Sequence, residues 1–215
     1  MKALIVGGTG MVGNLVLTNC LKSDKISEVI SLVRKPTGQS HSKLNEVIIT
    51  KFDDYSEHED LFKNVDVTFF CIGVYTRQVP DKLFKKITVD YAVEFAKTLE
   101  AQSPKARICL LSGAGADRSE KSKSSFARYK GMAENRVAKL NLEFYSFRSA
   151  YNYPVEPRKE PNIVYKIFRS LYPFLKLLGS NYSIKSTELA DAIYYVGVNG
   201  AKKEILENKD ILSVR

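Results

Sequence analysis

The sequence has few of the residues that build metal sites or disulfide frameworks. It contains 3 cysteines and 2 histidines among 215 residues. Neither the cysteines nor the histidines have a spacing typical of metal ligands, so we expect no metal. Each cysteine lies in an apolar stretch, where a free thiol acts as a small apolar side chain, and this indicates a reducing, cytoplasmic setting. The residues concerned are Cys20, Cys71, Cys109, His41 and His58.

Long apolar runs are also missing. No stretch of about 18 apolar residues occurs, and the most apolar late segment, residues 163–178, is broken by Lys166, Arg169 and Lys176. The apolar run at the N-terminus stops at glycines and is too short for a signal peptide. We therefore expect a buried strand there and no membrane span. Two interpretations of residues 163–178 stay open: a core-packing or lid helix, and a helix at a membrane surface.

The positive charge is large but has no obvious focus. The formal net charge is +9 with a pI near 9.3, while 44% of residues are hydrophobic and 27% are charged, as in ordinary globular proteins. Cations attract nucleic acid, anionic membranes and phosphorylated cofactors alike, but here they are scattered along the chain. We expect no nucleic-acid partner, and local motifs must decide the ligand.

Short β-rich apolar runs alternate with longer helical ones, which predicts parallel βαβ units. The fold class expected is α/β, a Rossmann-type doubly wound parallel sheet with strand order 3-2-1-4-5-6 and a short C-terminal helical segment. The predicted strands are residues 3–6, 29–33, 47–51, 67–72, 107–111 and 143–148. The predicted helices between them are residues 11–21, 57–62, 84–102 and 124–140.

The alternation stops after the sixth predicted strand. Pro154, Pro157 and Pro161 interrupt the chain, and helical patterns follow at residues 163–178, with a kink at Pro173, and at 187–197. This tail is too short for a domain of its own. We predict one domain over residues 1–215, in which residues 152–215 close over the carboxyl ends of the strands, on the substrate side.

A glycine-rich turn follows the first predicted strand and opens the first helix. In Gly7-Gly8-Thr9-Gly10-Met11-Val12-Gly13, the first glycine permits a tight turn, Gly10 lets backbone approach a pyrophosphate, and Gly13 lets the helix pack closely on the strand. The amide groups at the helix start then face the anion. The motif predicts a dinucleotide site, with a glycine turn that binds nothing as the alternative.

Cations stand where a site for NAD would have an acid. About 20 residues beyond such glycines, an acidic residue accepts a hydrogen bond from the ribose 2′-hydroxyl, but Arg34 and Lys35 occupy this place. A guanidinium can instead pair with a 2′-phosphate. This favours NADP(H), unless the two side chains are only loop charges of a basic protein.

These motifs together resemble the atypical short-chain dehydrogenase/reductase group, and within it the NmrA-like and Tat-interacting-protein-like branch. The likeness includes Gly7-x-x-Gly10-x-x-Gly13 and Arg34, and it extends over nearly the whole chain. Further matching segments are Phe52-Asp53, CIGVYTRQVP at 71–80, LLSGAGADRSEKS at 110–122, YKGMAEN at 129–135, FYSFRSAY at 144–151 and residues 183–192.

The resemblance implies the position of each part of the cofactor. Thr9, Gly10, Met11 and Val12 would lie along the pyrophosphate, and Arg34 with Lys35 at the adenosine phosphate. Asp53 would lie by the adenine unless it is a turn residue, and Ile72 and Gly73 would lie by the adenosine ribose. Cys71, just before them, would also be a cofactor-binding residue, with a core role as the alternative. Ser112, Lys130 and the stretch after Arg148 would approach the nicotinamide.

The predicted catalytic group is Ser112, Tyr129 and Lys130, and it departs from the family pattern. Family reductases place a tyrosine four residues before the lysine, where this chain has Phe126, which has no proton to give. Tyr129, next to Lys130, is rotated by about 100° on a helix. The family also has a serine beyond Ser112, where Gly113 and Ala114 stand here, so Ser112 is either catalytic or bonded to strand-end backbone.

Two functions therefore stay open. One is an NADP(H)-dependent oxidoreductase acting on a small carbonyl or alkene with a rearranged proton-transfer group, which could include Tyr75 or Tyr151. The other is a catalytically weak NADP(H)-sensing protein whose surface is read by a protein partner. The substrate and the oligomeric state leave no mark in the sequence.

Overall fold

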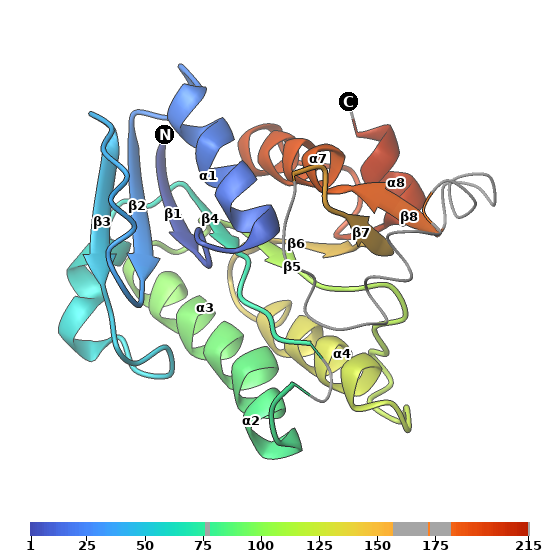
Figure 1. The fold of residues 1–215 in the computed structure, drawn as a ribbon. Coiled ribbons are helices and arrows are strands. Elements are labelled where there is room, and N and C mark those ends of the chain that lie inside the picture. Colours follow the sequence, from blue (N-terminus) through green and yellow to red (C-terminus); the bar gives the residue numbers. More distant parts are fainter. Residues whose placement is uncertain (76–77, 157–171, 173–181, 215) are drawn as a thin grey trace.

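The fold is built on a parallel sheet, as the sequence predicted. The computed structural model describes residues 1–75, 78–156, 172 and 182–214. Its main sheet has the order β3-β2-β1-β4-β5-β6-β9, and all neighbours run parallel (Figure 1). The strands are β1 (Lys2–Val6), β2 (Glu28–Val33), β3 (Leu44–Ile48), β4 (Val67–Phe70), β5 (Arg107–Leu111), β6 (Glu143–Arg148) and β9 (Ile205–Glu207). The predicted α/β fold and the predicted order of the first six strands are confirmed.

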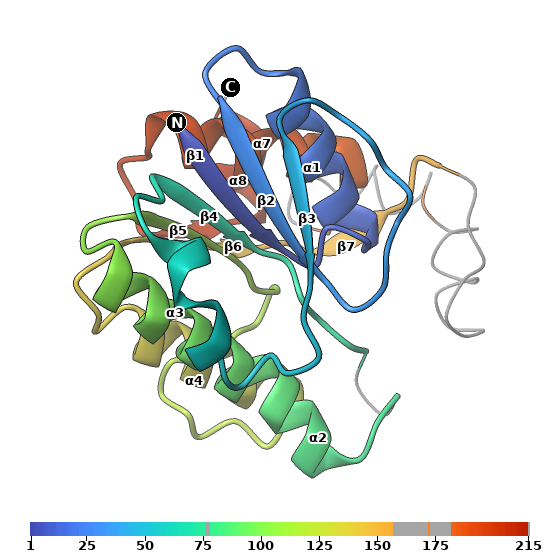
Figure 2. The same cartoon turned by 90° about the vertical axis from the view of Figure 1, so that its left-hand side faces the viewer.

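Helices cover both faces of this sheet. The helices are α1 (Met11–Lys22), η1 (Ser56–Phe62), α2 (Asp81–Lys85), η2 (Lys86–Asp90), α3 (Tyr91–Gln102), α4 (Ser125–Val137), α7 (Ser186–Asn199) and α8 (Asn208–Ser213). Helices α1 and α7 lie together on one face, and α3 and α4 lie together on the other (Figure 2). A sheet covered in this way is apolar on both faces, which explains the nearly continuous apolar strands.

Strand β1 shows how the two apolar layers form. Its side chains alternate between the faces, so Ala3 and Ile5 join the core under α1 and α7 while Leu4 and Val6 join the core under α3 and α4. All four are 0% exposed. Because β1, β4 and β5 are parallel neighbours, their carboxyl ends meet at one edge of the sheet. The glycine turn after β1 therefore lies beside the segments that follow β4 and β5.

The third strand lies earlier than predicted. Residues 47–51 were expected, but the strand is Leu44–Ile48, because β3 pairs with β2 from Leu44 opposite Val29 to Ile48 opposite Val33. As an edge strand, β3 is only partly buried, so its most apolar residues do not mark its start. The sequence prediction also missed β9, whose short pairing with β6 gives no distinct pattern.

The helix predicted at residues 84–102 begins earlier and is not uniform. Pro80 at the N-cap and Asp81 in the first turn start the helical segment, as both residue types favour helix starts. A π-helical segment, η2, separates α2 from α3. Such segments accommodate one extra residue per turn and often lie at functional sites.

The tail is described only in part. Two short strands, β7 (Tyr151–Tyr153) and β8 (Ser183–Lys185), pair in parallel, and α7 matches the helix expected at 187–197. The predicted helix at 163–178, like Pro157 and Pro161, falls outside the described residues, apart from Tyr172. The single-domain boundary stays a prediction. Among the described residues, no helix combines the length and the apolar character that crossing a membrane needs.

We expect Gly131→Ala to destabilise the fold by about 1–3 kcal/mol, the usual cost of overpacking. A Cβ at Gly131 in α4 would lie 1.9 Å from the backbone oxygen of Asp117, so helix and loop must separate. Thermal and urea unfolding would measure the loss. Gly73→Ala is the matched control, because no atom lies within 4 Å of its added Cβ. Equal midpoints for both variants would contradict the prediction.

Candidate functional site

The glycine turn is a close contact between three backbone segments. Gly7 has φ +87°, a conformation that favours glycine. A Cβ on it would lie 2.7 Å from the carbonyl carbon of Cys71, just after β4. A Cβ on Gly13 would lie 2.2 Å from the oxygen of Gly7. Glycine at these two positions therefore lets α1 start directly against the ends of β1 and β4.

The start of α1 has the properties of an anion site. Gly10 is the N-cap, no side chain caps the helix, and its first turn contains no acid. Thr9 and Gly10 are exposed, while Met11 is partly buried and Val12 is buried. The backbone amides and the positive end of the helix dipole can therefore receive a diphosphate without a competing carboxylate. The turn fits the dinucleotide that the motif predicts.

Arg34 and Lys35 follow β2 directly and are exposed. The loop that they begin is held at two points. The carboxylate of Glu46 in β3 accepts from the backbone amide of Thr37 at 2.8 Å and from its hydroxyl at 2.6 Å. The loop also approaches α1, where the Gln39 amide donates to Asn14 at 3.4 Å. The two cations thus extend from an anchored loop.

Asp53 lies after β3, where the resemblance implied an adenine contact. Its carboxylate forms an ion pair with Lys86 of η2 at 2.6 Å. The hydrogen bond from Lys86 lowers the pKa of Asp53. The positive charge of Lys86 therefore offsets the negative charge of Asp53 in the segment after β3, the strand that pairs with β2.

Residues after β4 come against the glycine turn. Cys71 is buried, and burial raises the pKa of its thiol to about 12, so it stays protonated. Ile72 is partly buried, and Gly73 is exposed with open space around its Cα. The chain thus passes from the core at Cys71 to the surface at Gly73 within three residues.

Lys130 of α4 extends toward the end of β5. Its ammonium group donates to the backbone oxygen of Leu111 at 2.9 Å. Burial lowers the pKa of Lys130 to about 8, while the negative charge of Glu134 acts in the opposite direction. A lysine in this range can exchange a proton near neutral pH.

The other two predicted catalytic side chains have carboxylate partners. The Ser112 hydroxyl donates to the buried Glu134 at 2.7 Å. The Tyr129 hydroxyl donates to Asp81 of α2 at 2.6 Å, and its ring packs on Phe84. Ser112 and Lys130 thus both lie where the end of β5 meets α4. Tyr129, in contrast, is directed toward α2.

Phe126 stands where the family pattern has its tyrosine. A Cβ on Gly113 would lie 2.5 Å from the tip of the Phe126 ring. The ring therefore lies directly on the Gly113 backbone. The two departures from the family pattern fit each other, because a larger side chain at residue 113 would displace the ring.

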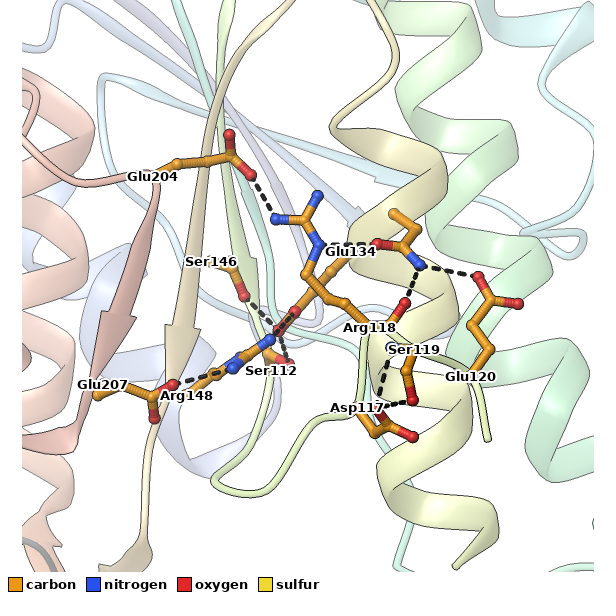
Figure 3. Close-up of polar contacts among 11 residues, drawn as sticks. Ser112, Asp117, Arg118, Ser119, Glu120, Glu134, Ser146, Arg148, Glu204 and Glu207 are labelled. Atoms are coloured by element: carbon orange, nitrogen blue, oxygen red, sulfur yellow. Dashed lines mark hydrogen bonds and ion pairs between the residues drawn. The ribbon is translucent and has the colours of Figure 1, made fainter. Parts of the chain in front are cut away.

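This region also contains a buried ion pair that was not predicted from the sequence. Glu134 is 0% exposed and pairs with Arg148 at 2.6 Å, and it also accepts from Ser146 at 2.8 Å (Figure 3). The one available signal was its place four residues after Lys130, on the same helix face. Arg148 and Ser146 lie on β6, and a third partner, Ser112, directly follows β5, so the cluster requires the folded sheet.

Comparison with protein families assigns the chain to one family. The model of the NAD dependent epimerase/dehydratase family matches residues 3–200. The chain belongs to this family.

One sequence relative and two solved structures illustrate what the chain is similar to. "Protein FMP52, mitochondrial" of Eremothecium gossypii is 27% identical over 144 residues, and the match spans 66% of this chain and 62% of that relative's length. WbmG of Bordetella bronchiseptica, in complex with NAD, superimposes with a TM-score of 0.71 at 15% identity, covering 96% of this chain and 72% of that chain.

Gre2 of Candida albicans, in complex with NADPH, has a TM-score of 0.73 at 13% identity, covering 96% of this chain and 77% of that chain. At these identities the structural likeness shows the fold alone. The two solved structures were obtained with different nicotinamide dinucleotides, WbmG with NAD and Gre2 with NADPH.

We expect the 3 cysteines to resist alkylation in the native protein, since all of them are buried and free. The thiolate is the reactive form, and at pH 8 a thiol with the pKa of about 12 found for Cys20 and Cys71 is roughly 0.01% ionised. Iodoacetamide labelling followed by mass spectrometry would test this, with urea-unfolded protein labelling fully. Lys97→Cys, at an exposed position, serves as the positive control. Labelling of Cys71 at the control's rate would contradict the prediction.

Proposed function

We propose that the protein is an NADP(H)-binding oxidoreductase of this family, acting on a small carbonyl or similar substrate. The observation that carries the proposal is the pair of exposed cations, Arg34 and Lys35, after β2, together with a helix start that is free of acids. An NAD site needs an acceptor for the ribose hydroxyl there, whereas a guanidinium binds a phosphate through paired hydrogen bonds.

The charges around the second and third strands support this preference. The acid nearest in sequence after β3 that could bind a ribose, Asp53, is paired with Lys86, and Glu46 is occupied by Thr37. Both carboxylates are thus engaged within the protein. The cations of the loop therefore remain for a phosphorylated ligand. Among the described residues, no acid forms an ion pair with Arg34 that would compete with such a ligand.

The proposed cofactor contacts follow the order of the strands. When bound, the reduced dinucleotide supplies a hydride to the substrate. The glycine turn would hold the diphosphate, the cations after β2 the adenosine phosphate, and Asp53 would lie by the adenine. Cys71, Ile72 and Gly73 would lie along the ribose, and Ser112 and Lys130 toward the nicotinamide, with a catalytic role for Tyr129 staying a prediction.

A second candidate function is an NADP(H)-sensing protein with little turnover. Phe126 favours it, because the ring fills the place of the family tyrosine and lies against Gly113. Cofactor binding would then order a surface for a protein partner. The NmrA-like branch and the cytoplasmic location stay predictions, and the sequence relative from Eremothecium gossypii carries the word mitochondrial in its name.

Thermal stabilisation by NADPH, NADP⁺, NADH and NAD⁺ tests the cofactor preference. We expect the phosphorylated pair to raise the melting temperature more, because at equal concentration the ligand that binds the folded state more tightly stabilises it more. In Arg34→Ala, the affinity for NADPH should fall about 10–100-fold, the loss of a charge-assisted contact, while that for NADH changes little.

Lys97→Ala removes one positive charge from the exposed surface of α3 and is the control for net charge. Equal stabilisation by all four nucleotides would remove the role assigned to Arg34. Oxidation of NADPH with quinones, aldehydes or ketones then separates the two candidate functions, because the sensing protein would bind without turnover.

A further inference from the structure

The site contains a fully buried acid whose role the family pattern does not explain. Among the side chains that the structure describes, the buried polar set contains no acid or base other than Glu134. One oxygen of Glu134 accepts from Ser112, from Ser146 and from Nε of Arg148 at 3.0 Å. The other pairs with Nη2 of Arg148, as Figure 3 shows. These donors stabilise the ionised carboxylate.

Arg148 is held from its other side as well. Its Nη1 group donates to Glu207 at 2.9 Å, at the end of β9. The fork of the guanidinium thus bridges a buried and a half-exposed carboxylate. Glu134 consequently has a fixed position in an ion pair with Arg148, one helical turn from Lys130 on α4.

The three predicted catalytic side chains differ in how many of their protons are already used in hydrogen bonds within the protein. Ser112 has one hydroxyl proton, which it donates to Glu134, and Tyr129 donates its own to Asp81. The ammonium group of Lys130 carries three protons, and its hydrogen bond to the Leu111 carbonyl uses one of them. Within this group, Lys130 is the side chain with protons left for a ligand.

We propose that Lys130 is the proton donor of this site and that Glu134 is the positioning residue that keeps its ammonium group charged. The inference rests on the proposed function. In a carbonyl reduction, the carbon would accept a hydride as a C–H bond of the reduced dinucleotide breaks and the dinucleotide is oxidised. The π electron pair of the C=O bond moves to oxygen, and that oxygen takes a proton as an N–H bond of Lys130 breaks. The neutral amine then regains a proton from water.

The groups around Lys130 determine the direction in which its pKa should shift in each variant. Glu134 is on the same helix, Cys71 follows β4, and the Leu111 carbonyl ends β5. Burial lowers the pKa of Lys130 to about 8, and Glu134 raises it against that effect. Cys71 is protonated at neutral pH, since burial raises the pKa of its thiol to about 12. Removing the charge of Glu134 should therefore lower the pKa of Lys130.

The pKa of Lys130 can be measured without substrate, by NMR titration of the ¹⁵N-lysine-labelled protein, with Lys130→Met to assign the signal. We expect a pKa near 8 in the wild type and a fall of about 1 unit or more in Glu134→Gln, as for the loss of a close opposite charge. Glutamine keeps an oxygen for Ser112 and Ser146. Arg148→Gln removes the cation that offsets Glu134, so it should raise the pKa.

Glu207→Gln is the matched control. It neutralises the other carboxylate on Arg148 but not the one beside Lys130, so the pKa of Lys130 should stay within about 0.3 units of the wild type, a shift small beside that of a close charge. Glu134→Gln and Arg148→Gln should shift the pKa of Lys130 in opposite directions, so either variant alone tests the inference if the other fails to fold. A wild-type pKa above 10, or no response to either variant, would overturn the inference.

Activity provides an independent readout with any substrate found in the NADPH screen. The rate of reduction should fall as the pH rises through the pKa of Lys130, because the donor must be protonated, and this limb should move to lower pH in Glu134→Gln. Lys130→Arg keeps the charge but releases no proton in this range, so kcat should fall by about 100-fold or more.

The possible failures have different signatures. If no nucleotide stabilises the wild type, the proposed function fails, whatever the NMR titration shows. If NADPH binds and Lys130 titrates above pH 10, only the present inference fails. If NADPH binds, Lys130 titrates near 8 and no carbonyl is reduced, the assignment of a proton donor is overturned and the sensing function is favoured.

Discussion

The close approach of the α1 start to the ends of β1 and β4 is the contact on which the site depends. Gly7 and Gly13 permit it, since a Cβ at either position would overlap neighbouring backbone. The approach brings the helix amides to the edge where the carboxyl ends of the parallel strands meet. Because those ends share one edge, residues far apart in sequence, such as Arg34 after β2 and Lys130 at the end of β5, lie along the same edge of the sheet.

The interior behind this edge is charged, which is unusual for a sheet packed on both faces. The cluster of Glu134, Arg148, Ser112 and Ser146 joins α4 to β5 and β6. Burying an ion pair contributes little net stability compared with apolar packing, but removing one partner is costly. A cluster of this kind therefore fixes the geometry of nearby groups, and Lys130 lies one turn away on the same helix.

The family places the chain among proteins whose chemistry depends on a bound nicotinamide, and the departures from the reductase pattern are local. Phe126 against Gly113 replaces a hydroxyl by an apolar contact, and Tyr129 is bonded to Asp81. The glycine turn at the start of α1 lies apart from these departures, which concern α4 and the residues after β5.

Local pattern was sufficient for the fold class and the glycine turn. Buried parallel strands are short apolar runs, and Gly7, Gly10 and Gly13 follow the first of them at a spacing that backbone geometry demands. The strand order followed from the alternation of elements. The start of β3 and the existence of β9 did not, because edge strands are half exposed and their bounds are determined by pairing with β2 and β6.

What only the tertiary structure decided was the direction of polar side chains. The sequence shows that Ser112, Tyr129 and Lys130 lie near the end of β5 or on α4, but not that Ser112 meets Glu134 or that Tyr129 meets Asp81. Hydrogen-bond partners from distant segments depend on distances that no local pattern encodes. Composition and periodicity determine which elements form, and packing determines which charges meet.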